Sequence, residues 1–344
     1  MHPDNPAIWA VAAGMTLGAA TGFLLERSRY CTMGALTDVF LFSSWRRLRV
    51  WMVAIAVTTA ALSCLASLGI LDPARSAPVA GNAGIPLSIL GGLLFGIGMV
   101  LAGGCASRSL VRLGSGSLKS LLVILLMMVF ASAVIAGPFA DLLQPAAPWR
   151  PDPVIPDTIP ARVIVALVAL LFLAACAWRQ IRRGERRELW LGLALGAVCT
   201  AAWSLSGGLF EREAPRSVDF LVPGVDLFLA LTSGELAHGG RPPAVFSTSL
   251  VAGAMFGAFA SSLAGGSFAI ETFSDAGDMK RHVCGGVAMG IGGGLAFGCT
   301  FGQGIGGLST LAPGPVLIVL GVVLGARIGL LHLEGRLRWP PAAS

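Results

Sequence analysis

The sequence predicts an all-α integral membrane protein. Hydrophobic residues make up 55% of the 344-residue chain and charged residues only 12%, whereas about a quarter of the residues in soluble domains are charged. The mean hydropathy is +0.79. Apolar stretches also recur at the length of roughly 17 to 25 residues that crosses a bilayer. A soluble protein is therefore excluded, and the lipid bilayer is the first expected partner.

The apolar stretches predict about nine transmembrane helices. They cover residues 8–25, 50–71, 86–103, 119–140, 161–178, 188–207, 245–265, 284–299 and 314–333. The first stretch follows Met-His-Pro-Asp-Asn, which has no basic region of the kind that precedes a secretory signal. We therefore expect this span to remain in the mature protein.

Four further segments are too short to cross a membrane and too apolar to be ordinary loops. They are residues 32–44, 106–116, 224–238 and 300–311. Irregular backbone at membrane depth is tolerated only where it is buried in protein or lines a polar cavity. We interpret these segments as four short re-entrant helices that form the walls of a pathway.

An internal duplication divides the chain into two repeats. Residues 91–105 and 285–299 share nine identities in fifteen positions, and both segments end in Gly-Cys. We assign repeat one to residues 6–140, a connector helix to 141–180 and repeat two to 188–333, all within one transmembrane domain spanning 1–344. A single connecting span inverts the second repeat, which is a common design of transporters with a substrate site between the repeats.

Basic residues cluster at the ends of the spans. The clusters are Arg46, Arg47 and Arg49; Arg108, Arg112 and Lys119; Arg179, Arg182, Arg183, Arg186 and Arg187; and Arg336 with Arg338. Cytoplasmic loops of membrane proteins carry an excess of Lys and Arg. Orientation therefore accounts for the net charge of +6 without nucleic acid as a partner. It predicts a periplasmic N-terminus, a cytoplasmic C-terminus and an outside segment that contains Asp141, Asp152 and Asp157.

Three of the seven cysteines are candidates for function. A disulfide framework is not expected from an odd number of cysteines in apolar surroundings, and we interpret Cys64 and Cys176 as small apolar residues. Cys31, Cys105 and Cys299 each begin a short segment, where backbone N–H groups and the helix dipole attract anions. Repeat one contains two of these thiols and repeat two only one, because Leu209 aligns with Cys31.

The three cysteine motifs resemble those of a known family. The strings GFLLERSRYCTMGALTDVFL, GGLLFGIGMVLAGGCASRSLVRLGSGS and GGVAMGIGGGLAFGCTFGQGIGGLS are similar to motifs of the YeeE/YedE family of bacterial sulfur transporters. The resemblance runs from about residue 10 to residue 330. It implies nine spans and four short helices in the bacterial inner membrane, thiosulfate uptake, and one cysteine of each motif on the substrate path. The chain departs from the family at Arg108, which is either a positive-inside residue or a determinant of anion selectivity.

We predict that thiosulfate passes successive weak thiol sites. A neutral thiol is a weak donor that suits the soft terminal sulfur of thiosulfate, and weak sites let an ion both bind and leave. Inversion of the repeats leads us to expect Cys105 and Cys299 to face each other. The predicted substrate-binding residues are Cys31, Thr32, Gly104, Cys105, Ala106, Gly298, Cys299, Thr300 and Gln303.

Other polar residues are weaker candidates. Glu26, Arg27 and Arg29 are either a gate network or interfacial charges, and Ser204 and Ser206 are either hydrogen-bond donors to the anion or helix contacts. Glu235 and His238 are candidates for the outer vestibule or for the surface. Family resemblance also implies a small cytoplasmic sulfur-carrier protein, with residues 179–187 as its contact.

Two alternatives remain open. The first is a permease of the same fold for another sulfur or selenium species. The second is a membrane thiol-disulfide protein, although the chain has no Cys-x-x-Cys. The sequence has neither a phosphate-binding Gly-x-x-x-x-Gly-Lys-Ser/Thr loop nor closely spaced Cys and His ligands. We therefore expect no enzyme activity, no metal and no cofactor.

Overall fold

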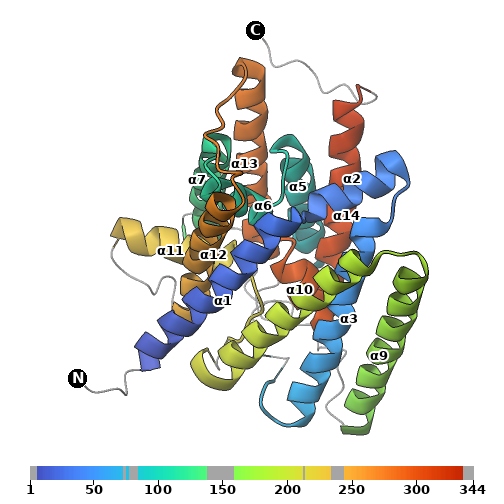
Figure 1. The fold of residues 1–344 in the computed structure, drawn as a ribbon. Coiled ribbons are helices and arrows are strands. Elements are labelled where there is room, and N and C mark those ends of the chain that lie inside the picture. Colours follow the sequence, from blue (N-terminus) through green and yellow to red (C-terminus); the bar gives the residue numbers. More distant parts are fainter. Residues whose placement is uncertain are drawn as a thin grey trace.

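A bundle of long helices forms the protein (Figure 1). The structure is a computed structural model that describes residues 6–72, 75–76, 84–137, 159–211, 214–233 and 244–335. Within these ranges every regular element is a helix. The long helices are α1 (Pro6–Ser28), α3 (Arg46–Ser67), α5 (Ile85–Leu101), α7 (Leu118–Ile135), α9 (Ile159–Arg182), α10 (Arg186–Leu205), α12 (Val245–Ala264), α13 (Ala276–Ala296) and α14 (Pro313–Leu333).

The prediction of an all-α integral membrane protein is confirmed. Eight apolar segments in the described ranges are long enough to span a bilayer. The ninth predicted span corresponds to α13, which has 21 residues and is not one of those eight. Its first turns carry Asp278, Lys280 and Arg281. Helix α13 nevertheless packs along both α5 and α7 in the middle of the bundle.

The four predicted short segments are helical. They form α2 (Thr32–Phe42), α6 (Ala106–Gly114), α11 (Val222–Ser233), and a π-helical turn η3 (Gly302–Gly307) that continues into the 3₁₀ turn η4 (Leu308–Thr310). A second π-helical turn, η2 (Ser206–Phe210), extends α10. The candidates Glu235 and His238, and the acidic outside segment with Asp141, Asp152 and Asp157, lie outside the described residues.

The two halves of the chain are paired crosswise. Helix α1 packs on α12 while α3 packs on α10, and α5 packs on α14 while α7 packs on α13. The contacts between α5 and α13 are also reciprocal. Gly91 in the first half of α5 lies against Gly292, and Gly98 further along α5 lies against Gly285. The absence of side chains lets these backbones approach closely. Each half is thus completed by helices of the other half.

Helix α9 lies at the edge of the bundle (Figure 1). It packs mainly on α3 and exposes a series of large apolar side chains that includes Ile164, Leu167 and Leu171. These side chains suit the hydrocarbon core of a bilayer. The residues that position the candidate site therefore come from the other helices.

Candidate functional site

Each of the three candidate cysteines lies shortly before a helical segment. Cys31 is the N-cap of α2 and Cys105 the N-cap of α6, both with extended backbone. Cys299 precedes η3, and its carbonyl accepts a hydrogen bond from the N–H of Gln303 at 2.8 Å. The first N–H groups of a helix have no partner within the helix. The sequence thus places three sulfurs beside backbone donors, as predicted.

Two of the thiols form a pair. Cys31 Sγ lies 3.6 Å from Cys105 Sγ, and Cys105 Sγ lies 3.2 Å from Ser107 Oγ. Cys105 is fully buried, and its neighbours Gly104 and Ala106 are also buried. The N-terminal ends of α2 and α6 converge, so Cys105 meets Cys31. The expected facing of Cys105 and Cys299 stays a prediction.

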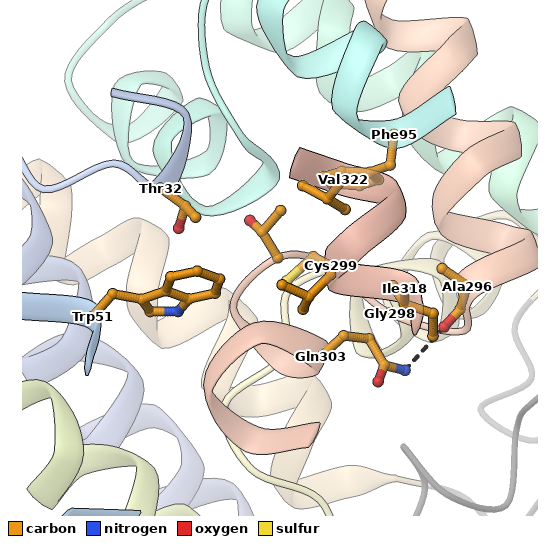
Figure 2. Close-up of a pocket in the computed structure, with 11 residues that line it drawn as sticks. Thr32, Trp51, Phe95, Ala296, Gly298, Cys299, Gln303, Ile318 and Val322 are labelled. Carbon is orange, nitrogen blue, oxygen red and sulfur yellow. Dashed lines mark hydrogen bonds between the residues drawn. The ribbon is translucent and has the colours of Figure 1, made fainter. Parts of the chain in front are cut away.

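Cys299 lines a separate narrow cavity (Figure 2). The lining residues are Thr32, Trp51, Phe95, Ala296, Gly298, Cys299, Thr300, Gln303, Ile318, Val319 and Val322. Thr32 also follows Cys31 directly, so this residue connects the cavity to the thiol pair. The cavity volume is about 10 Å³, close to the minimum for a single water. An anion larger than water requires the wall to move.

Two buried oxygens beside this cavity have no hydrogen-bond partner in the described part of the chain. They are the hydroxyl oxygen Thr300 Oγ1 and the amide oxygen Gln303 Oε1. The amide nitrogen of Gln303, in contrast, donates to the carbonyls of Ala296 at 2.9 Å and Phe297 at 3.1 Å. Gln303 therefore supports the turn that ends α13, and Thr300 is the residue with a free donor.

Asp219 is a buried acidic residue that the sequence reasoning missed. Its carboxylate accepts the N–H of Cys299 at 3.2 Å, and it also accepts from Leu221 and Val222. The last two bonds cap the start of α11, and an acidic residue just before an apolar helix is a recognisable capping signal. Asp219 thereby fixes the backbone at Cys299. The bond from Asp219 to Cys299 joins segments 80 residues apart, so it could not be read from the sequence.

Charged residues line a second cavity, at the end of the bundle where α1 ends and α7 and α13 begin. This cavity of about 180 Å³ is lined by Glu26, Arg29, Arg108, Arg112, Ser115, Ser117, Ser267, Ala269 and Glu271. Arg108 donates to Glu26 at 3.2 Å and Arg112 to Glu271 at 2.9 Å. The hydrogen bond from Arg112 lowers the pKa of Glu271. Arg108 is therefore one partner of an ion pair that is mostly shielded from solvent.

The weaker candidates have structural partners. Ser204 donates to the Thr200 carbonyl within α10, and Ser206 donates to the Arg216 carbonyl at 2.7 Å. Both serines therefore act as helix or loop contacts. No three His, Cys, Asp or Glu side chains converge on a metal position within the described ranges.

Comparison with known proteins gives a consistent set of relatives. The chain is 26% identical to the thiosulfate transporter TsuA of Escherichia coli (strain K12) over 323 residues, which cover 86% of each chain. It is 25% identical to the TsuA protein of Spirochaeta thermophila over 342 residues, covering 92% of this chain and 96% of the relative. A probable transporter of E. coli, YedE, is 31% identical over 102 residues, or 30% of this chain and 24% of the relative.

A family profile described as sulphur transport matches residues 27–328. The match includes Cys31, Cys105 and Cys299 and most of each cysteine motif. It spans most of the chain. The protein belongs to the sulphur transport family, as its cysteine motifs predict.

Proposed function

We propose that this protein carries thiosulfate across the bacterial inner membrane into the cytoplasm. The observation that carries the proposal is the position of the thiols, because the cavity beside Cys299 shares Thr32 with the Cys31–Cys105 pair. Two relatives that align with most of the chain are named thiosulfate transporters. The proposed substrate, membrane and route rest on the position of the thiols and on these relatives.

The chemistry of the site suits a soft anion. Thiol, hydroxyl, amide and apolar groups line the cavity at Cys299, and Cys105 contacts the thiol of Cys31 and the hydroxyl of Ser107. No cationic side chain among the described residues forms a hydrogen bond with either sulfur. A strong ion pair would retain a dianion, whereas weak thiol donors let it leave. Thiosulfate passes Cys299 first and the Cys31–Cys105 pair second in this proposal. Its atoms and charge are unchanged on passage, so no enzymatic step is involved.

The charges at the ends of the helices support an orientation in the membrane. The charged cavity and the α9–α10 turn lie at the end where α1 ends and α3 begins, which we assign to the cytoplasm. At this end Arg49 pairs with Glu185, and Arg46 pairs with Glu188. The basic turn from α9 to α10 is then available to a cytoplasmic sulfur-carrier protein. The reciprocal contacts between α5 and α13 support the two inverted repeats, 6–140 and 188–333.

Uptake by cells tests the proposal. A strain that cannot take up sulfate should grow on thiosulfate as its sole sulfur source only when this protein is expressed. Replacing Cys31, Cys105 and Cys299 together by Ala should abolish growth and uptake of labelled thiosulfate. The matched control replaces Cys64, Cys176 and Cys284, which lie outside the site, and should transport normally. Normal uptake by the first triple variant would contradict the thiol route.

Competition separates thiosulfate from the alternative substrates. Labelled thiosulfate, sulfite and selenium oxyanions should be compared in the same cells at equal concentrations. We expect thiosulfate to be preferred because only thiosulfate combines a soft terminal sulfur with a double negative charge. Faster uptake of a selenium oxyanion would favour the selenium permease instead.

A further inference from the structure

Arg216 is a buried arginine that forms no salt bridge with a carboxylate of the described residues. The residue is 8% exposed, and its Nε is fully buried without a hydrogen bond in the described part of the chain. Arg49, in contrast, forms a salt bridge with Glu185. Burial of an unpaired charge is costly, so natural proteins rarely keep one without a ligand.

The segment around Arg216 is held rigidly. Ser206 Oγ donates to the Arg216 carbonyl at 2.7 Å and accepts from the Arg216 N–H at 3.2 Å. Ser217 Oγ donates to the Cys199 carbonyl at 3.3 Å. These three bonds fix the backbone to α10 and η2. The arginine side chain is therefore placed by the fold and does not depend on an ion pair for its position.

The same segment packs against the turn that carries the Cys299 site. Gly306 of η3 lies against Ser217, and Gly302 lies against Asp219. Asp219 is occupied by the N–H groups of Cys299, Leu221 and Val222, so its carboxylate is committed to the backbone. Arg216 is thus linked through one layer of packed backbone to the cavity beside Cys299. It lies beyond the end of α10, away from the charged cavity with Arg108.

We propose that Arg216 binds a small divalent oxyanion, thiosulfate itself, before the anion reaches Cys299. The guanidinium presents several N–H donors in a planar fork that matches the oxygens of an oxyanion. Charge supplies the capture step, and the weaker thiols supply the passage that follows. The choice of thiosulfate as the ligand rests on the proposed function, whereas the unpaired arginine does not.

Substitution by methionine separates binding from folding. Arg216→Met keeps an unbranched side chain and removes the buried charge, so the purified protein without ligand should unfold at an equal or higher temperature. Thiosulfate should raise the unfolding temperature of the wild type in a saturable way, because a ligand of the folded state stabilises it. The variant should lose this rise, and its half-saturating concentration for uptake should increase at least tenfold.

Two further variants complete the design. Arg49→Met removes a partly buried arginine that is paired with Glu185, so it should unfold at a lower temperature and keep the thiosulfate-induced rise. If Arg216→Met does not fold, Arg216→Lys decides the question. If Arg216 binds the anion, the lysine variant should need a higher thiosulfate concentration for half-saturated uptake. If its role is purely structural, the variant should be less stable but have an unchanged half-saturating concentration.

One result would overturn the inference: thiosulfate raises the unfolding temperature of Arg216→Met, and the half-saturating concentration of this effect is within twofold of the wild-type value. Absence of any rise in the wild type with either thiosulfate or sulfate would overturn it as well. If the wild type transports no thiosulfate but shows an Arg216-dependent rise with sulfate, the proposed function fails and the anion site remains.

Discussion

On the proposed route, the ion passes two thiols whose sulfurs lie 3.6 Å apart. Each sulfur is a weak donor and a weak acceptor, so Cys31 and Cys105 can satisfy each other while no ion is present. A passing anion has only to replace this weak contact. An arginine in the same place would bind the anion more strongly and release it more slowly. The nearby cation Arg108 is paired with Glu26.

The thiol pair makes a prediction about oxidation. Diamide should take one hydrogen from each thiol, join Cys31 to Cys105 by a disulfide and become the corresponding hydrazine. Uptake of thiosulfate should then fall at least tenfold and return after reduction with dithiothreitol. Peptide mass spectrometry should detect the linked peptides. Cys31→Ser cannot form the bond, so residual uptake by this variant should be insensitive to diamide.

An unchanged rate of uptake in fully linked protein would show that the pair lies off the route. The same experiment bears on the thiol-disulfide alternative. The structure supplies the paired cysteines that this alternative needs, although they are far apart in the sequence and come from different motifs.

Sequence reasoning at the residue scale identified the cysteines but not their partners. A cysteine at the start of a short helix can be found from glycine and apolar patterns, so Cys31, Cys105 and Cys299 were all predicted. The Cys31–Cys105 contact depends on how α2 and α6 approach each other, which spacing does not specify. Asp219 and Arg216 were missed because their meaning comes from burial and missing partners, and neither property is visible in an apolar string.

At the scale of elements, glycines determine which helices pair. Gly14, Gly18 and Gly22 lie along the face of α1 that meets α12, and each touches a backbone carbonyl of α12. Without a hydrophobic drive between helices in lipid, close van der Waals packing holds such pairs together. The α1–α12 pair then fixes where α1 ends, and with it the position of Cys31.

Gly22→Ala tests this packing. An added Cβ would overlap the Ala254 carbonyl, so the helices must separate or shift. We expect a loss of about 1–3 kcal/mol of stability, as for other overpacked cores, despite the better helix propensity of alanine. Thermal unfolding in detergent measures the loss. Gly208→Ala is the control, since its nearest neighbour would be Ile70 Cγ2 at 3.4 Å, and equal stability of both variants would contradict the packing argument.

Most elements could be predicted because apolar length and span ends are properties of the sequence. The π-helical turn η3 could not, since its form depends on Trp51, Ser217 and Asp219, which pack against its glycines.

At the scale of the whole molecule, the positive charges define two different ends. We propose that the end with the charged cavity is cytoplasmic, and labelling of single cysteines tests this orientation. In a background where Cys64, Cys176 and Cys284 are replaced by Ala, a membrane-impermeant maleimide should label Leu68→Cys in intact spheroplasts. Ser274→Cys should be labelled only after permeabilisation, because it precedes α13 at the other end.

Both substituted positions are exposed in the structure, so equal access of the reagent is built into the comparison. Labelling of Ser274→Cys in intact spheroplasts would reverse the orientation and with it the direction of the proposed route. The sequence alone predicts the alternation of the spans. The structure adds that the cavity beside Cys299 and the charged cavity with Arg108 are two different cavities.

The crosswise pairing of the halves has a consequence for synthesis of the chain. Gly14 of α1 packs against Phe246 of α12. At about 5–20 residues per second, the ribosome needs on the order of ten seconds or more after Gly14 to synthesise Phe246. During this interval α1 lies in the bilayer with its glycine face unfilled. The nascent chain, more than the finished transporter, is then the form that membrane proteases and wrong partner helices can attack.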